Sequence, residues 1–150
     1  MIVAPANPRD PGCAALLAQS HALMEAMFNP GECHYLDIDA LTGPEIRFVA
    51  ASDGDAVLGT GALALRDDYA EVKSMFTAPE ARGRGVADAI LRHLIDLATC
   101  EGRPLLRLET GVGLDAAHRL YARHGFTPCG PFGTYEAGPA SLFFERVPMP

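Results

Sequence analysis

The stretch "APEARGRGVADAI", residues 78–90, places two glycines and two arginines between an apolar run and a segment with helical periodicity. Gly83 and Gly85 lack a Cβ, so the backbone can turn tightly here and lie close to another group, at an entropic cost. A glycine-rich turn that leads into a helix presents free backbone N–H groups beside the positive end of the helix dipole. The stretch therefore predicts a phosphate-binding turn with Arg82 and Arg84 at its rim.

Two common phosphate-binding motifs do not fit this turn. The dinucleotide fingerprint G-x-G-x-x-G requires a third glycine at the position of Asp88. The nucleoside-triphosphate loop G-x-x-x-x-G-K-[ST] requires a lysine that this stretch lacks. The residues therefore indicate a phosphate-bearing ligand without identifying it.

Strands and helices alternate on both sides of the turn. Upstream, residues 45–51 and 56–65 are expected to form a hairpin around Asp53 and Gly54, and residues 69–77 a third strand of an antiparallel meander. Along this third strand the side chains are expected to alternate strictly, with one face made of Glu71, Lys73 and Met75 and the other of Ala70, Val72, Ser74 and Phe76. Downstream, apolar residues at helical spacing begin at Val86, and Gly102 is a stop signal. Further elements are expected as a strand at 2–5, a helix from Asp10 and Pro11, a loop or short helix over 33–44, a buried strand at 105–110, a helix from Asp115 to Gly125, and a last strand at 141–147.

Length and composition predict a single α/β domain over residues 1–150. The chain has 150 residues, 49% hydrophobic and 21% charged, which is typical of a protein with one core. Twelve Lys and Arg against 19 Asp and Glu give a net charge of -7, so neither nucleic acid nor a membrane is expected as a partner. Seven of the basic residues nevertheless fall between positions 82 and 123: Arg82, Arg84, Arg92, Arg103, Arg107, Arg119 and Arg123. Of these, Arg92, Arg119 and Arg123 are expected on solvated helix faces. Any anionic ligand is expected in that half of the chain.

The cysteines and the start of the chain carry no further signal. The four cysteines show no C-x-x-C spacing, which argues against a zinc site and a redox dithiol, so no metal is expected. There is no 18-residue apolar run, and "MIVAPANPRD" lacks the features of a signal peptide. A cytoplasmic location is the expectation.

The pattern Arg82-x-x-Gly85-x-Ala87 resembles the R/Q-x-x-G-x-G/A signature of the GNAT acetyltransferase superfamily. Its surroundings are similar too: "RLYARHGF", residues 119–126, matches the L-Y-x-x-x-G-F motif, and "EVKSMFTAPEARGRGVA", "LETG" and "CGPFGTY" look like a subgroup of small bacterial members. The resemblance covers residues 45–147 and, more loosely, the first helix. One departure is Leu114, where many members have an asparagine, so no side-chain role is assigned there.

This resemblance implies a single-domain GNAT fold, a mixed and mostly antiparallel sheet that is splayed at its middle and has helices on both faces. Acetyl-CoA would lie in the wedge between the strands at 70–77 and 105–110. The resemblance implies that the backbone of Arg82, Gly83, Arg84, Gly85, Val86 and Ala87 binds the pyrophosphate. It further implies that the pantetheine arm runs along Met75, Phe76 and Thr77, bonded like an added strand.

The implied reaction is direct transfer of acetyl from acetyl-CoA to a primary amine of a small molecule or protein, in a ternary complex. Tyr121 matches the position that often stabilises or protonates the departing thiolate. Glu71 lies on the strand where several members place a catalytic glutamate. Glu71 is equally expected to be a surface residue that forms an ion pair with Lys73 and has no catalytic role. In that case Glu109, or a chain of waters, could serve as the base.

The resemblance leaves the acceptor open. His34 and Tyr35 are expected to line its pocket, with Glu109, whereas a Cys33–His34 nucleophile is disfavoured because neighbouring residues on an extended chain point apart. The acidic chain makes a polyamine, an aminoglycoside or a protein lysine electrostatically reasonable. A homodimer is the family's habit, and residues 128–144 could supply its apolar edge strand. The alternative functions are a non-catalytic acyl-CoA-binding or sensing protein, and an interaction module in which the turn merely connects.

Overall fold

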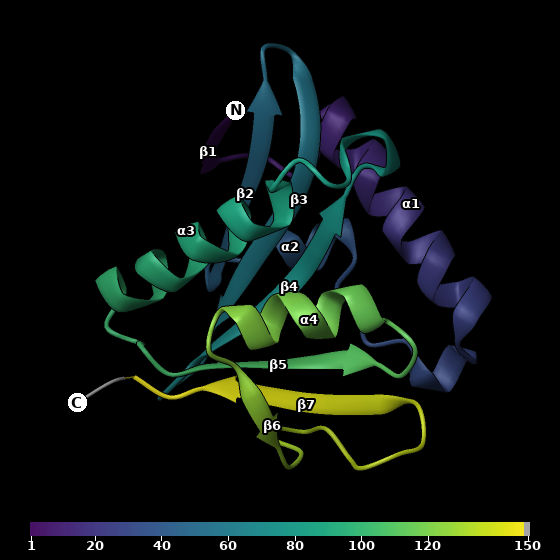
Figure 1. Ribbon diagram of the computed structural model, residues 1–150, viewed down its shortest axis with the longest axis vertical. Coiled ribbons are helices and arrows are strands. Elements are labelled where there is room, and N and C mark those ends of the chain that lie inside the picture. Colours follow the sequence, from purple (N-terminus) through teal and green to yellow (C-terminus); the bar gives the residue numbers. More distant parts are fainter. Residues whose placement is uncertain (149–150) are drawn as a thin grey trace.

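Residues 1–148 are described by the computed structural model, in which one seven-stranded sheet lies between two pairs of helices (Figure 1). The strands are β1 (Ile2–Pro5), β2 (Ile46–Asp53), β3 (Ala56–Leu65), β4 (Ala70–Thr77), β5 (Leu106–Gly111), β6 (Thr127–Cys129) and β7 (Ser141–Arg146). The helices are α1 (Pro11–Met27), α2 (Ile38–Leu41), α3 (Val86–Cys100) and α4 (Asp115–Arg123), with short 3₁₀ turns η1 (Pro30–Glu32) and η2 (Pro79–Ala81). The strand order is β1-β2-β3-β4-β5-β7-β6, and only β4 and β5 run parallel. The expected mixed α/β fold is confirmed.

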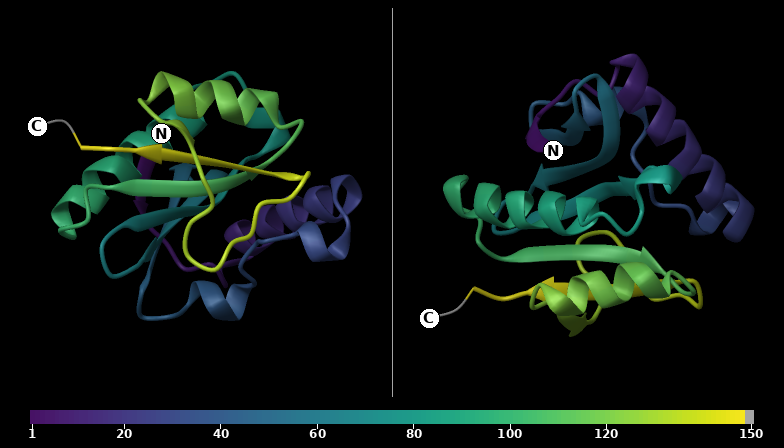
Figure 2. Two further views of the ribbon diagram at one scale, coloured as in Figure 1. Left: turned by 90° about the horizontal axis from the view of Figure 1, so that it is seen from below. Right: turned by 45° about the horizontal axis from the view of Figure 1, so that its top comes forward.

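Alternation along β2 separates the two layers of the core. Ile46, Phe48 and Ala50 pack with buried residues of α1 and α2, whereas Val49 and Ala51 pack with those of α3. This follows because successive side chains of a strand point to opposite faces of the sheet. Figures 1 and 2 show the result, with α3 and α4 over one face and α1 and α2 over the other.

Helix α3 lies close against β3, and this contact positions the glycine-rich turn. Its buried stripe includes Val86, Ile90 and Leu94, as the spacing predicts. A Cβ added at Gly61 of β3 would lie only 2.6 Å from Ile90 Cγ2, so glycine is needed for this approach. The start of α3 is therefore fixed beside the end of β4.

Strands β4 and β5 diverge, as expected for a splayed sheet. Their register pairs are confined to Ala70 with Leu106 and Glu71 with Arg107, at the beginning of β4. Beyond them, β5 continues to pair with β7 over residues 106–111, while β4 turns away with β3 (Figure 1). A wedge opens between the two halves of the sheet.

One expectation about the strands is wrong. The strict alternation expected for residues 70–77 ends at Lys73, where the register with β3 shifts and Ser74 adopts φ 57°. Met75 and Phe76 both pack beside the main core as a result. The last strand, β7, lies between β5 and the short edge strand β6, which the sequence analysis did not predict.

The described residues 1–148 include no helix that is both long and apolar enough to span a lipid bilayer.

Candidate active site

The glycine-rich turn after β4 has the conformation that its glycines permit. Gly83 and Gly85 both have φ 78°, in the left-handed region that L side chains rarely adopt. Residues 82–85 are exposed, and Gly85 is the N-cap of α3 with no side chain to bond the first turn. The first backbone N–H groups of α3 are thus uncapped, which suits an anion at this point.

The charged side chains near the turn differ in whether they form ion pairs. Arg84 pairs with Asp53 of the β2–β3 hairpin at 3.6 Å, whereas Arg82 has no ion-pair partner within residues 1–148. Asp88, in the first turn of α3, pairs with Arg123 at the end of α4 and with the following His124, at 3.1 and 2.9 Å. Hydrogen bonds from His124 and then Arg123 lower the pKa of Asp88. Its negative charge is therefore balanced by α4.

A β-bulge interrupts β4 where the wedge opens. Thr60 pairs with Phe76 and Ala62 with Lys73, so the single residue Gly61 faces both Ser74 and Met75. The Oγ of Ser74 is buried and finds no hydrogen-bond partner in the described part of the chain. Beyond the bulge, Phe76 and Thr77 pair with β3 on one side only, within residues 1–148. Their other edge is free to bond a strand-like ligand.

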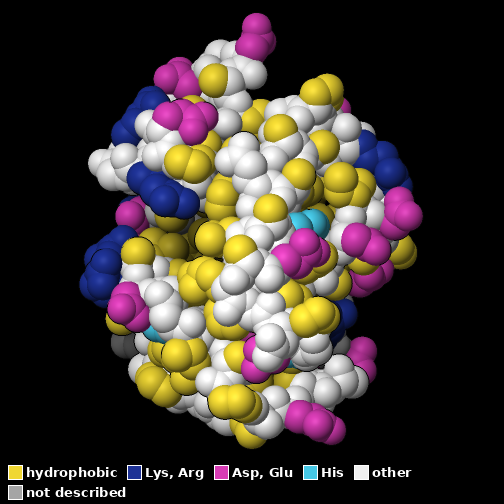
Figure 3. Space-filling model, turned by 90° about the vertical axis from the view of Figure 1, so that its right-hand side faces the viewer, with side chains coloured by type: hydrophobic (Ala, Val, Ile, Leu, Met, Phe, Trp, Pro, Cys, Tyr) yellow, Lys and Arg dark blue, Asp and Glu magenta, His cyan; other side chains and the backbone are white. Residues whose placement is uncertain are grey.

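Figure 3 shows the side of the molecule toward which β4 and β5 diverge. A hollow in this face has hydrophobic side chains inside it and Lys or Arg side chains along one edge. Such a hollow fits a ligand with an apolar arm and an anionic end.

Tyr121 of α4 is buried against aromatic side chains of the lower half of the sheet. Its ring lies 5.8 Å from that of Phe126 and 6.3 Å from that of Phe144, and only 7% of the residue is exposed. Burial, with a smaller effect of the Glu109 charge, raises the pKa of Tyr121 to about 12. The phenol is therefore protonated at neutral pH and can donate a hydrogen bond.

Glu71 and Lys73 lie on one face of β4, as predicted, but they are buried rather than at the surface, with 2% and 9% exposure. One Glu71 oxygen accepts from Arg66 Nη2 at 3.1 Å, and the other accepts from the Tyr135 hydroxyl and lies 3.4 Å from Lys73 Nζ. Lys73 Nζ also donates to the His34 carbonyl and to the Tyr135 hydroxyl, both at 2.8 Å. The carboxylate thus accepts two hydrogen bonds, from Arg66 and Tyr135, and lies beside the Lys73 cation.

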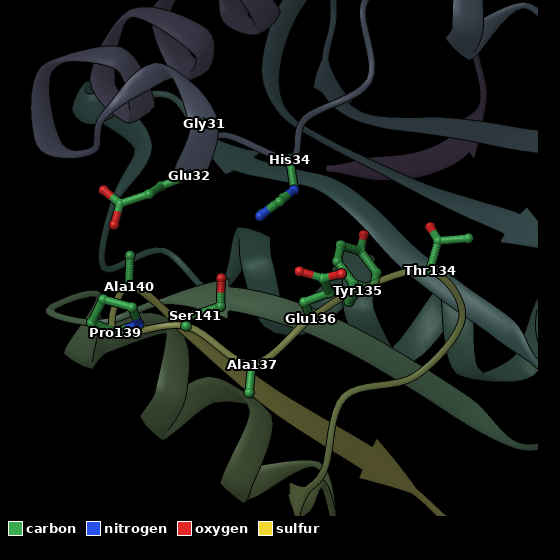
Figure 4. A pocket seen from close by; sticks show the side chains of 11 residues that line it. Gly31, Glu32, His34, Thr134, Tyr135, Glu136, Ala137, Pro139, Ala140 and Ser141 are labelled. Carbon is green, nitrogen blue, oxygen red and sulfur yellow. The ribbon is translucent and has the colours of Figure 1, made fainter.

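Two cavities adjoin this cluster, and both are lined by His34 and Tyr135, whose rings meet edge to face at 5.3 Å. The larger, of about 440 Å³, is lined by His34, Tyr35, Leu36, Arg66, Tyr69, Glu71, Lys73, Gly133, Thr134 and Tyr135. Figure 4 shows the smaller, of about 370 Å³, into which Glu32, His34, Tyr135 and Ser141 extend. The loop from Phe132 to Ala140 contributes to both.

The remaining predicted residues lie near these cavities. Tyr35 stacks on His21 at 3.9 Å between ring centroids, and its hydroxyl donates to Glu25 at 2.6 Å. Glu109 of β5 accepts from Ser141 Oγ at 2.8 Å and has no ion-pair partner within residues 1–148. The structure thus brings His34, Tyr35 and Glu71 to one cavity and places Glu109 beside the other.

Sequence reasoning missed Arg66, Tyr135 and Thr60. Tyr135 lies in a Gly/Pro-rich loop, and its partners on β4 are more than 60 residues away in sequence, so no local pattern points to them. Arg66 lies in the short polar segment between the strands predicted at 56–65 and 69–77, and nothing in that segment indicated a role in a site. No three His, Cys, Asp or Glu side chains within residues 1–148 are grouped to hold a metal ion.

Comparison with known proteins gives consistent matches. Residues 16–126 match the model of the Acetyltransferase (GNAT) family. The chain is 41% identical to the uncharacterized N-acetyltransferase YedL of Escherichia coli over 138 residues, which cover 90% of this chain and 87% of that protein. It is 35% identical to a protein of Azospirillum brasilense named IAA acetyltransferase over 146 residues, which cover 96% and 95% of the two chains.

Solved structures agree. A Klebsiella pneumoniae protein described as an acyl-CoA N-acyltransferase superposes with a TM-score of 0.84 at 28% identity, covering 97% of this chain and 95% of that one. A GNAT acetyltransferase from Elizabethkingia anophelis with acetyl-CoA bound shares the fold, with a TM-score of 0.71 at 18% identity and coverage of 97% and 96%.

Proposed function

This chain belongs to the GNAT acetyltransferase family, and we propose that it transfers acetyl from acetyl-CoA directly to a primary amine within a ternary complex. Acetyl-CoA-dependent acetyl transfer is the activity of the family. We further propose that the acetyl group passes to the amine without a covalent enzyme intermediate, and we assign the residues that take part. The observation that carries it is the position of β4. Its free backbone edge borders the wedge, and its Glu71 and Lys73 side chains border a cavity.

The turn between β4 and α3 would hold the pyrophosphate. The residues proposed for this are Arg82, Gly83, Arg84, Gly85, Val86 and Ala87. Support comes from the exposed glycine turn, the uncapped start of α3 and the unpaired Arg82 within residues 1–148. The free edge of Met75, Phe76 and Thr77 would bond the pantetheine arm.

The bulge would polarise the thioester. Residues at a bulge turn their backbone groups away from the regular ladder, and backbone N–H groups are good donors to a developing oxyanion. The N–H groups near Met75 and Phe76 follow Ser74, whose backbone is in the left-handed region. The Thr60 hydroxyl donates a hydrogen bond of 2.9 Å to the Ser74 carbonyl and so holds this backbone in place. We assign these N–H groups to the thioester carbonyl.

Tyr121 would stabilise the leaving group. Its pKa of about 12 lies above that of an ordinary thiol, about 8.5, so complete proton transfer to the thiolate is unfavourable. A hydrogen bond from the phenol to the thiolate is favourable in this buried site. Tyr121 is therefore assigned as a donor that stabilises the departing CoA thiolate.

Glu109 is favoured over Glu71 as the general base. Both Glu71 oxygens are already engaged, one by Arg66 and the other by Tyr135 with Lys73 3.4 Å away, so neither is free to take a proton from an acceptor amine. Glu109 accepts one hydrogen bond, from Ser141. In this scheme the amine nitrogen attacks the acetyl carbon, its surplus proton passes to Glu109, and the carbon–sulfur bond breaks to release the thiolate. The alternative general base is Glu71 or a water molecule.

Kinetics and mass spectrometry together test direct transfer. Initial rates of thiol release, measured while acetyl-CoA and an amine are both varied, should give intersecting double-reciprocal lines. The protein incubated with acetyl-CoA alone should keep its mass. Parallel lines with an acetylated protein would contradict the proposal, because they indicate a covalent intermediate.

The homodimer and the cytoplasmic location stay predictions. Sedimentation of the purified protein tests the first, and fractionation of cells that express the chain tests the second.

A further inference from the structure

We propose that the acceptor carries a carboxylate and that Arg66 binds it in the cavity beneath Tyr135, so that the substrate is a small amino carboxylate. This inference rests on the proposed function. The charged residues lining this 440 Å³ cavity are Arg66, Lys73 and Glu71, two positive against one negative. The cavity therefore has one surplus positive charge, in a chain whose net charge is -7.

Lys73 does not supply the surplus positive charge of this cavity. Its ammonium group has three donors, and it contacts three oxygens, those of His34, Tyr135 and Glu71. With 9% exposure it is effectively inside the protein, where Glu71 balances its charge. The Lys73 charge is therefore already neutralised by Glu71 and is not left over for a ligand.

Arg66 is the group with donors to spare. Among hydrogen bonds within residues 1–148, its side chain uses only Nη2, toward Glu71. The side chain is 39% exposed and lines the cavity, so its remaining N–H groups are within reach of a ligand. A guanidinium group matches the geometry of a carboxylate and binds it with two parallel hydrogen bonds.

The second cavity has the opposite charge. Glu32 and Glu136 line it, and Ser141 connects it to Glu109. An amine is attracted to this side, where Glu109 is the proposed base. His34 and Tyr135 line both cavities, so a substrate with an amine at one end and a carboxylate at the other would pass beside their rings.

The size and local charge of the site favour this class over the cationic acceptors suggested by the net charge. Cavities of about 370 and 440 Å³ lie at the lower end of small-molecule sites, roughly 300–1,000 Å³. Exposed charges more than about 8 Å away are largely screened at physiological salt, so the nearby Arg66 outweighs the distant acidic surface.

Matched acceptor pairs test the inference. The probes are phenylalanine against phenethylamine and 4-aminobutyrate against n-butylamine, with rates corrected to the concentration of unprotonated amine. The proteins are wild type, Arg66→Gln and Arg47→Gln. Arg47 is the matched control because its side chain is similarly exposed, at 37%, and also pairs with a glutamate, Glu101, at 2.9 Å. It lines neither cavity.

The expected result is a kcat/KM at least about tenfold higher for the carboxylated member of a pair, since hydrogen bonds between charged groups are among the strong ones. Arg66→Gln should lower kcat/KM roughly 10- to 100-fold for that member only. Arg47→Gln should leave both unchanged. Equal kcat/KM within each pair, or an equal effect of Arg66→Gln on both members, would overturn the inference while acetyl transfer itself stands.

A binding measurement covers the case in which no probe is acetylated. N-acetylphenylalanine should raise the unfolding temperature of the wild type more than N-acetylphenethylamine does, and Arg66→Gln should abolish the difference. If both compounds act alike, the inference is overturned. The proposed function fails separately, if acetyl-CoA neither stabilises the protein nor donates its acetyl group to any amine.

Discussion

The hydroxyl of Thr60 on β3 donates a hydrogen bond to the backbone carbonyl of Ser74, 2.9 Å away across the bulge of β4. Thr60 is completely buried, and Ser74 is the one residue other than glycine with positive φ among residues 1–148. A single side chain thus supports the strained point from which the proposed oxyanion donors follow. The bulge is therefore stabilised by a specific buried hydrogen bond.

Replacing Thr60 by valine tests this support. The two side chains have nearly the same shape, so the loss is the hydrogen bond to the Ser74 carbonyl, worth about 1–2 kcal/mol of stability. We expect kcat to fall about tenfold, since one oxyanion donor out of place costs at least that much. Urea unfolding and initial rates measure both. Thr99→Val, the same exchange on the exposed side of α3, is the control, and an unchanged kcat in Thr60→Val would mean that the bulge only serves folding.

Tyr121→Phe should lower kcat roughly 10- to 100-fold, the value of one charge-assisted hydrogen bond to the thiolate. Folding stability should change little, because the Tyr121 hydroxyl makes no side-chain hydrogen bond within residues 1–148. The protonated phenol is lost only as the pH rises through about 12, so the wild-type rate should show no loss from Tyr121 below about pH 10. Full turnover by the variant would remove Tyr121 from the mechanism.

Glu109→Gln and Glu71→Gln separate the two candidate bases. Loss of the base costs about 100-fold or more in kcat at neutral pH, and rising pH should restore part of it as the free amine accumulates. We expect this behaviour from Glu109→Gln. Glu71→Gln should mainly destabilise the fold, by about 3 kcal/mol, because Lys73 would stay buried without a counter-charge. The reverse pattern, measured by pH–rate profiles and urea unfolding, would identify Glu71 as the base.

Asp88 makes stability depend on pH at the acid end. Its pKa is lowered by hydrogen bonds from His124 and Arg123, so its contribution is complete above the ordinary aspartate pKa of about 3.9 and is lost as the pH falls through the lowered value. Asp88→Asn should therefore cost about 0.5–1 kcal/mol at pH 7 and almost nothing at the acid end. Urea unfolding across the pH range checks this. A difference that persists at low pH would mean that the loss is steric.

The fold was readable from the sequence where local signals decide it. The helix after Gly85, the hairpin at Asp53 and Gly54, and the strand at 105–110 follow from periodicity and turn residues. The motifs around Arg82 and Tyr121 indicated the family. Local rules failed at Ser74, because a bulge depends on the register with β3 and leaves no signal in β4 itself.

The acceptor side was less readable because its contacts are long-range. The hydrogen bond from Tyr135 to Glu71 joins residues far apart in sequence, and so does that from Lys73 to the His34 carbonyl. Charge composition pointed to a cationic acceptor, whereas the side chain that lines the cavity with free donors is Arg66. Such local charge can be read only after the loop from Phe132 to Ala140 is placed over β4.

The affinity of the Gly85→Ala variant for acetyl-CoA, measured by calorimetry against Gly102→Ala, is the most direct test that the pyrophosphate lies on the turn at 82–87. The two glycines have φ 78° and 74°, flank opposite ends of α3, and would each place a new Cβ with no atom within 4 Å. Both variants should lose a similar 1–2 kcal/mol of stability from the left-handed backbone. Gly85→Ala should bind acetyl-CoA at least about tenfold more weakly while Gly102→Ala binds it as the wild type does, because only the first Cβ would stand between the backbone and a phosphate. Equal affinities in the two variants would contradict the assignment.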